Sequence, residues 1–171
     1  MDIRPTSKSE RAFQLREARV IADAYKANFY GEATSSFLHQ IGTDRLWVTW
    51  PLDSSRVHER LQTKDQSRTS NPDFAAIACL VQVGPNNVPQ TSQSSEVFGQ
   101  KDVSIEIPAD INALQRERPE LAVAWREATR WAFSEAMASG YQIEDFCRAS
   151  RNDEPVGVYL LSAGKRVKDF A

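Results

Sequence analysis

The chain has 171 residues, 41% of them hydrophobic and 26% charged, with a formal net charge of -2. This size and composition are typical of one globular domain, and the weakly acidic balance without a run of lysine and arginine argues against nucleic acid as a partner. No apolar stretch approaches the ~18 residues that cross a bilayer, and the first residues lack the apolar segment of a secretory signal, so we expect a cytoplasmic protein that does not contact a membrane.

The first elements in chain order are predicted to be a helix and a strand. Ser7 and Glu10 match a capping box, and apolar residues at near-helical spacing continue the helix to about Asn28, before a stop at Gly31. Residues 46–50 are rich in β-forming side chains and end at a proline, which indicates a strand.

The middle of the chain is predicted to contain a short helix, a polar loop and a hairpin. Residues 55–61 form the helix after an aspartate or serine cap, and residues 63–73 are too polar to contribute to a core. Residues 74–83 are typical of a buried strand, and the Gly-Pro-Asn-Asn sequence at 84–87 predicts a tight turn into a second strand over 88–92.

The C-terminal part is predicted to be three strands and two helices. Alternating apolar residues over 103–107 indicate a strand, after which Asp110 caps a short helix and residues 120–139 form the longest one. Two strands, 141–148 and 156–161, complete the order. The long helix carries one apolar stripe, formed by Leu121, Trp125, Ala128, Ala132 and Ala136.

These elements predict an α+β fold with a mixed, largely antiparallel sheet and packed helices. We expect one globular unit of three parts. Residues 1–62 form a helix-strand-helix segment, residues 63–73 form the loop, and residues 74–171 form a module of three strands, helices and two strands.

Segments spread in order over nearly the whole chain carry a similarity to a known family. They are the tyrosine-rich turn at 25–32, the segment TDRLWVTWPLDSSRV at 43–57, and the C-terminal segments IEIPAD at 105–110, WREATR at 125–130, 140–141 and 159–161. Together they resemble the C-terminal half of proteins of the Gcn5-related N-acetyltransferase (GNAT) superfamily. The resemblance implies a GNAT-like fold and acyl transfer.

The resemblance also exposes a missing feature. In GNAT proteins the backbone N–H groups of a glycine-rich turn hold the pyrophosphate of acyl-CoA, whereas the seven glycines of this chain stand too far apart to form such a turn. Arg11 stands where the family helix usually carries an asparagine. We therefore expect that this chain alone binds no cofactor, and that acetyl-CoA binds only together with a partner.

Tyr30 and Asp44 are the candidate catalytic residues. The resemblance matches Tyr30 to a tyrosine that acts as an acid near the leaving thiolate in many GNAT enzymes, and the alternative is that it packs a helix end against the sheet. Asp44 stands before a strand, where loops present chemical groups on a rigid scaffold. Asp53, after the strand, is more typical of a helix cap.

Four residues are candidates for substrate binding. Arg45 and Trp50 belong to the same family-like segment as Asp44. Arg126 and Arg130 stand one helical turn apart, so their guanidinium groups can converge on one carboxylate, sulfate or phosphate. The alternative for this pair is a solvated helix face with ion pairs to nearby glutamates.

The cysteines and histidines do not indicate a metal site or a disulfide. Cys79 and Cys147 each lie in an apolar run, which favours buried free thiols. His39 and His58 have no further ligand at metal-binding spacing, and no Ser-His-Asp triad is indicated.

Two hypotheses for function follow from these patterns. In the first, the chain is a subunit of a split GNAT-like enzyme and forms the substrate side of the cleft. It would act on a small molecule, by acyl transfer or by a repurposed reaction of specialised-metabolite biosynthesis, with a second subunit like the GNAT N-terminal half or with another copy of itself. In the second, it is a non-catalytic GNAT-like module that binds and stabilises a partner protein.

Overall fold

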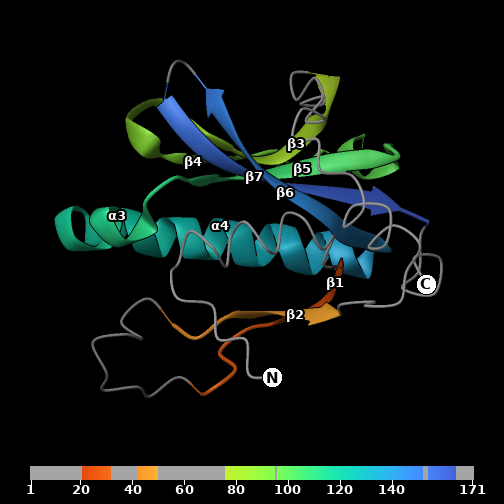
Figure 1. Ribbon diagram of the computed structural model, residues 1–171, viewed down its shortest axis with the longest axis horizontal. Helices are drawn as coiled ribbons and strands as arrows, with labels where there is room; N and C mark the ends of the chain where they lie inside the picture. Colours follow the sequence, from red (N-terminus) through yellow and green to blue (C-terminus); the bar gives the residue numbers. More distant parts are fainter. Residues whose placement is uncertain (1–20, 32–41, 50–75, 95, 152–153, 165–171) are drawn as a thin grey trace, which may run out of the picture.

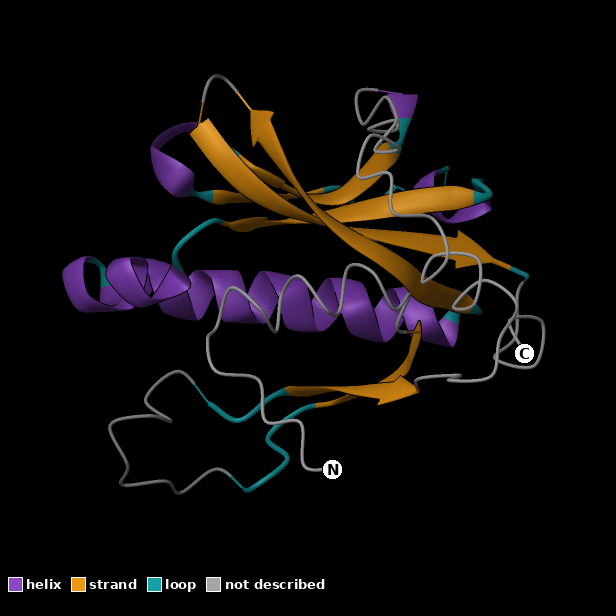
Figure 2. Cartoon of the chain, in the orientation of Figure 1, coloured by secondary structure: helices purple, strands orange, loops and turns teal. Residues whose placement is uncertain are grey.

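The computed structural model places the described residues in one sheet with helices packed against it (Figures 1 and 2). The described ranges are 21–31, 42–49, 76–94, 96–151 and 154–164. The elements are β1 (Ile21–Lys26), β2 (Arg45–Thr49), β3 (Ala78–Val83), β4 (Pro89–Thr91), β5 (Asp102–Pro108), α3 (Ile111–Glu117), α4 (Pro119–Ala138), β6 (Tyr141–Arg151) and β7 (Glu154–Ala163).

The strand order of the sheet is β2-β1-β6-β7-β5-β3-β4. Strands β3 and β5 run parallel, and the other neighbouring pairs of the described sheet are antiparallel. The expected α+β class with a mixed, largely antiparallel sheet is therefore confirmed. The boundaries expected at 62 and 73 lie outside the described residues.

Local sequence signals position the elements around α4. The side chain of Asp110 accepts a hydrogen bond from the N–H of Ala113 at 2.9 Å, so it caps α3 as expected. Pro119 is the first residue of α4, and Gly140, with φ 84°, follows the end of that helix. The β3–β4 turn contains two asparagines with positive φ, as its sequence predicts.

Helix α4 packs on the sheet through its predicted apolar stripe. Leu121, Trp125, Ala132 and Ala136 are buried, while Ala128 is half-buried beside them. Burying a side chain as large as that of Trp125 stabilises the fold by roughly 2–3 kcal/mol. Its indole N–H also donates to the carbonyl of Asn87 at 2.6 Å, which fastens α4 to the β3–β4 turn.

One prediction is wrong: residues 21–26 form strand β1 and not the end of a helix. β1 pairs with β2 from Ile21 opposite Thr49 to Lys26 opposite Arg45, with an irregularity between Ala22 and Ala24. Short apolar runs fit helix and strand alike, and here pairing with β2 decides the outcome. Residues 7–20 of the expected helix, the helix at 55–61 and the loop at 63–73 lie outside the described residues.

Within the described residues, the β1–β2 hairpin joins the rest of the sheet through β1 and β6. Ala22 pairs with Ile143 of β6, and this is the registered pair that joins the hairpin to the other strands. Figure 1 shows α4 running between the hairpin and the remainder of the sheet. Side chains of the hairpin that point toward α4 therefore contact that helix.

Candidate functional site

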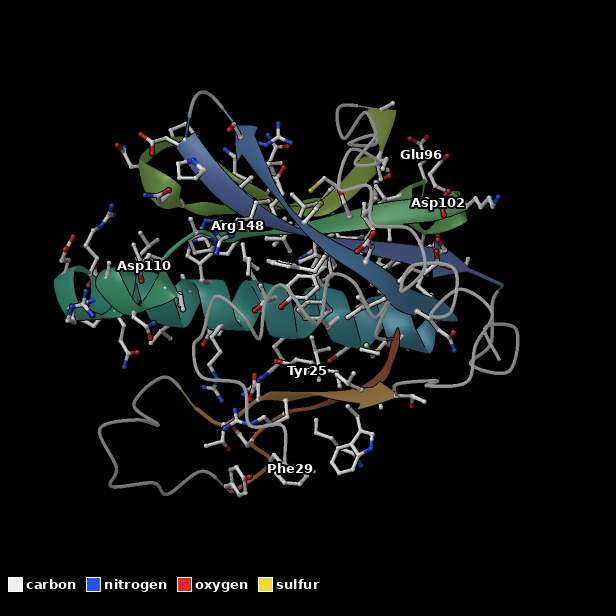
Figure 3. All side chains as sticks on the ribbon, in the orientation of Figure 1. Tyr25, Phe29, Glu96, Asp102, Asp110 and Arg148 are labelled. Carbon is white, nitrogen blue, oxygen red and sulfur yellow. The ribbon has the colours of Figure 1, made fainter. Side chains whose placement is uncertain are left out.

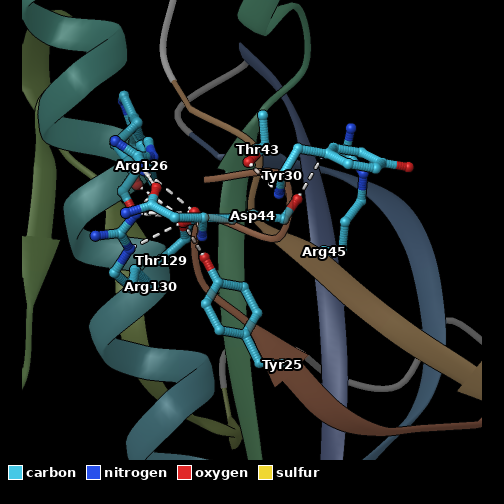
Figure 4. A network of polar contacts seen from close by, with 10 residues as sticks. Tyr25, Tyr30, Thr43, Asp44, Arg45, Arg126, Thr129 and Arg130 are labelled. Atoms are coloured by element: carbon cyan, nitrogen blue, oxygen red, sulfur yellow. Dashed lines mark hydrogen bonds and ion pairs between the residues drawn. The ribbon is translucent and has the colours of Figure 1, made fainter. Parts of the chain in front are cut away.

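Asp44 lies at the centre of a polar cluster where β2 begins (Figure 4). Its carboxylate accepts a hydrogen bond from the hydroxyl of Tyr25 on β1 at 2.5 Å and from the backbone N–H of Asn28 at 2.9 Å. Asn28 has a φ of 47°, a left-handed conformation that asparagine tolerates and that turns the chain out of β1. The turn thus aims a backbone donor at the carboxylate.

Both helix arginines converge on the same carboxylate. Arg130 donates from Nε and Nη2 to the two oxygens of Asp44 at 3.0 and 2.8 Å, and Arg126 donates from Nη2 at 3.2 Å. Each arginine also donates to the side-chain oxygen of Asn28. The one-turn spacing on α4 produces the expected convergence, and the anion held there is the protein's own aspartate.

The environment fixes the protonation of this cluster. Burial by itself would raise the pKa of Asp44, but the hydrogen bonds from Arg130, the Asn28 backbone, Tyr25 and Arg126 outweigh it and hold that pKa far below its usual range. Burial and the adjacent carboxylate raise the pKa of Tyr25 well above the usual tyrosine value. At neutral pH Asp44 is charged and Tyr25 is protonated.

Gly42 allows Arg126 to reach the cluster. A Cβ atom at position 42 would lie 2.1 Å from Cζ of Arg126, so the guanidinium group occupies the space that any other side chain would need. The φ of Gly42 is 96°, a conformation that favours glycine. Beside it, the buried Thr43 accepts hydrogen bonds from the N–H groups of Phe29 and Tyr30, each at 3.0 Å.

The other candidate residues lie outside this cluster. Tyr30 is 63% exposed, and the guanidinium carbon of Arg45 lies 5.5 Å from the centre of its ring. Arg45 also donates to the backbone carbonyl of Asp44 at 2.8 Å. Figure 4 shows Tyr30 and Arg45 on the opposite side of Asp44 from the helix arginines. Trp50 lies outside the described residues.

Sequence reasoning missed three members of the cluster. Tyr25 stands within the segment expected to be a helix, and no local signal marks it as a partner of Asp44. Asn28 and Gly42 do carry a signal, since both residue types tolerate the left-handed conformation that a turn requires. Their roles in the cluster depend on contacts with α4, which lies far away in sequence.

Three aromatic side chains of the hairpin form an exposed aromatic patch. The aromatic patch consists of Phe29, Tyr30 and Trp47, which are 42%, 63% and 53% exposed. The ring of Phe29 lies 4.9 Å from that of Tyr30 and 5.8 Å from that of Trp47, measured between centroids. Figure 3 shows Phe29 on the side of the hairpin that faces away from α4.

A second polar cluster joins β5 to β6 and β3. Glu106, only 3% exposed, accepts from Nε of Arg151 at 2.8 and 2.9 Å, from Nη2 at 2.5 Å, and from the N–H of Val83 at 2.8 Å. Hydrogen bonding to Glu106 raises the pKa of Arg151. Close by, burial raises the pKa of the Cys79 thiol, so this cysteine is not an activated nucleophile.

The described residues offer little for a metal or a buried small molecule. They contain no group of three or more histidine, cysteine, aspartate or glutamate side chains suited to hold a metal ion. A shallow hollow of about 400 Å³ lies at the starts of β3 and β5 and is lined by none of the predicted site residues. Within the same part of the chain, neither helix has the length and apolarity needed to cross a membrane. Cys79 and Cys147 are free thiols, half-buried and buried respectively.

Comparisons of this chain with models of protein families, with curated proteins and with solved structures found no match. The resemblance to the GNAT superfamily thus stays a prediction from the sequence motifs.

Proposed function

We propose that this chain is a non-catalytic module that binds and stabilises a partner protein through its β1–β2 hairpin. The observation that carries the proposal is the aromatic patch, a contiguous set of exposed rings on one hairpin. Contiguous exposed apolar surface of this kind marks interaction sites, and aromatic residues dominate the energetics of protein interfaces. The complex would form in the cytoplasm, as expected from the sequence.

The Asp44 cluster supports a structural role for the residues beneath the patch. All the acceptor capacity of the carboxylate is directed at Tyr25, the Asn28 backbone and the two arginines, so a substrate finds no free base there. The low pKa of Asp44 and the high pKa of Tyr25 also make both groups poor proton carriers near neutral pH.

The same cluster makes the hairpin a suitable platform for a partner. Arg126 and Arg130 on α4 hold Asp44 and Asn28, which lie on either side of the turn that carries Phe29 and Tyr30. A surface that is ordered before binding loses less conformational entropy in the complex than a mobile one. The patch is therefore presented on a braced hairpin.

One observation favours the enzymatic alternative, in which the chain supplies the substrate side of a GNAT-like acyltransferase. The hydroxyl-bearing ring of Tyr30 is exposed beside the cation of Arg45, where it is accessible to a substrate. In that case the partner would bind acetyl-CoA. Calorimetric titration with acetyl-CoA, with and without the partner, and the rate of a Tyr30→Phe variant would separate the two functions.

The proposal is tested by purifying the untagged chain from its native host and identifying proteins that co-purify in fixed proportion. We expect one companion that is lost from a Phe29→Ala, Trp47→Ala double variant. The matched control is a Val88→Ala, Val123→Ala double variant, because these valines are exposed elsewhere on the molecule.

The Val88→Ala, Val123→Ala control should retain the companion in full. A companion that is equally retained by both double variants would contradict binding through the hairpin. A rate of acyl transfer that Tyr30→Phe abolishes in an intact complex would favour the enzymatic alternative.

A further inference from the structure

The outer surface of the hairpin carries two like charges that form no ion pair with any side chain whose placement the structure describes. Lys26 and Arg45 stand directly opposite each other in the β1–β2 register, and both are exposed. Like charges in opposed positions on neighbouring strands destabilise a hairpin. Such a pair is explained if an anionic group of a ligand lies between or beside the two cations.

The charge beneath the hairpin has the same sign. The two guanidinium groups of Arg126 and Arg130 face the single carboxylate of Asp44, which leaves a surplus of one positive charge. The whole chain, in contrast, has a net charge of -2. Counted together, Lys26, Arg45, Arg126 and Arg130 carry four positive charges against the two negative charges of Asp23 and Asp44. The hairpin and the arginines beneath it are therefore cationic on an acidic protein, a distribution that selects partners by charge.

The backbone of β2 is available for pairing. β2 is the end strand of the sheet, and among the described residues it pairs with β1 on one side only. Alternate N–H and C=O groups on its outer side thus have no strand partner in the described part of the chain, and such an edge accepts an added strand. Trp47 and Val48 stand on this strand and are half exposed.

We propose that the hairpin binds an acidic, extended segment of a partner protein, which adds to the outer edge of β2 as a further strand. Carboxylates of the segment would pair with Lys26 and Arg45, and its alternate apolar side chains would contact Trp47 and the rest of the aromatic patch. This inference rests on the proposed function and specifies the chemistry of the partner.

Charge distinguishes this partner from a second copy of the chain. Pairing two β2 edges about a two-fold axis would bring the same cationic hairpin against itself, which costs free energy by like-charge repulsion. Single-stranded nucleic acid would satisfy the cations and stack on the rings but would leave the β2 backbone unpaired. An acidic polypeptide can pair with the two cations, contact the aromatic rings and pair with the β2 backbone.

The test uses the full chain, isotopically labelled for nuclear magnetic resonance, and three synthetic peptides of about ten residues. The first alternates glutamate with valine, the second replaces each glutamate by lysine, and the third is the acidic peptide with alternate backbone nitrogens methylated to block strand pairing. We expect the acidic peptide to bind and to shift the amide signals of Arg45–Thr49. The lysine peptide should not bind, and methylation should weaken binding by about tenfold or more.

Variants of the chain locate the charge contact. Arg45→Glu should weaken binding of the acidic peptide by about tenfold or more, and Lys101→Glu, at an exposed lysine outside the hairpin, should not. Raising the salt from about 50 mM to about 500 mM should also weaken binding. The inference is overturned by equal binding of the lysine peptide, by equal binding of the methylated peptide, by tighter binding of a single-stranded oligonucleotide, or by self-association of the chain through the hairpin.

The co-purified companion separates failure of this inference from failure of the proposed function. If the companion is lost in the Phe29→Ala, Trp47→Ala variant but retained by Arg45→Glu, the hairpin binds a protein and the inference of an acidic strand is wrong. If both variants retain the companion, the proposed function is wrong as well.

Discussion

Several hydrogen bonds converge on the carboxylate of Asp44. Five donors reach it, from the Tyr25 hydroxyl, the Asn28 backbone, Arg126 and, twice, Arg130. A carboxylate in this environment stabilises the fold only in its charged form, because each donor interacts with the charge. Its contribution to stability must therefore depend on pH.

The first prediction concerns Asp44→Asn. At pH 7 the variant should be less stable than the wild type by about 3 kcal/mol, because it leaves two half-buried arginines without their carboxylate. The pKa of Asp44 is lower in the folded chain than in the unfolded chain, so this stabilisation is complete above the unfolded value of about 4. It is lost as the pH falls from there toward the folded pKa, and the difference between the two proteins should shrink.

Urea unfolding of both proteins between about pH 7 and pH 2.5 measures this difference. Glu117→Gln, at an exposed glutamate on α3, is the control and should stay within about 0.5 kcal/mol of the wild type. A constant difference over the whole range would show that Asp44 does not act through its charge.

The elements that local chemistry determines were predictable from the sequence. The cap at Asp110, the proline that begins α4 and the asparagine turn before β4 depend on neighbouring residues, and the structure has them as expected. The alternation in β5 likewise places Val103 and Ile105 on one face and Glu106 on the other. These signals require no knowledge of distant contacts.

The elements that distant contacts determine were not predictable. Residues 21–26 have the spacing of a helix, yet they pair with β2 and their Tyr25 hydroxyl meets Asp44, 19 residues away. Arg130 lies 86 residues from Asp44, so the cluster depends on how the hairpin meets α4. In β6, the strand extends beyond the predicted end at 148 to Arg151, and only this extension brings Arg151 to Glu106.

The second prediction concerns this link between elements. Glu106→Gln should destabilise the protein by about 2 kcal/mol, a value reduced for the partial exposure of Arg151, because the guanidinium loses its charged partner. Arg151→Met in the same chain should recover part of the loss, since it removes the unpaired cation. A double-mutant cycle from urea unfolding gives the coupling between the two side chains. Glu135→Gln, at an exposed glutamate of α4, serves as the neutral control. Strictly additive effects of the two substitutions on the free energy of unfolding would show that Glu106 and Arg151 do not interact.

At the scale of the whole molecule, α4 joins two parts that the sheet alone connects weakly. Above α4 in Figure 1, β5, β6 and β7 are paired over most of their lengths. Below it, within the described residues, the β1–β2 hairpin meets β6 at Ala22 opposite Ile143 and is also held by side chains that contact α4. The attachment of the hairpin, and with it the aromatic patch, thus depends on the Asp44 cluster.

The third prediction follows from this arrangement and concerns the order in which the molecule opens. In native-state hydrogen exchange, the backbone amides of β1 and β2 that pair with each other should exchange at a lower opening free energy than those shared by β5 and β7, because fewer contacts must break. Arg130→Met should lower the opening free energy of the hairpin by about 1–3 kcal/mol and leave that of β5 and β7 nearly unchanged. Glu106→Gln should show the reverse pattern, since Glu106 and Arg151 lie in the other part. If Arg130→Met lowers all opening free energies equally, the hairpin and the main sheet unfold as one unit, and the Asp44 cluster stabilises the whole protein without bracing the hairpin in particular.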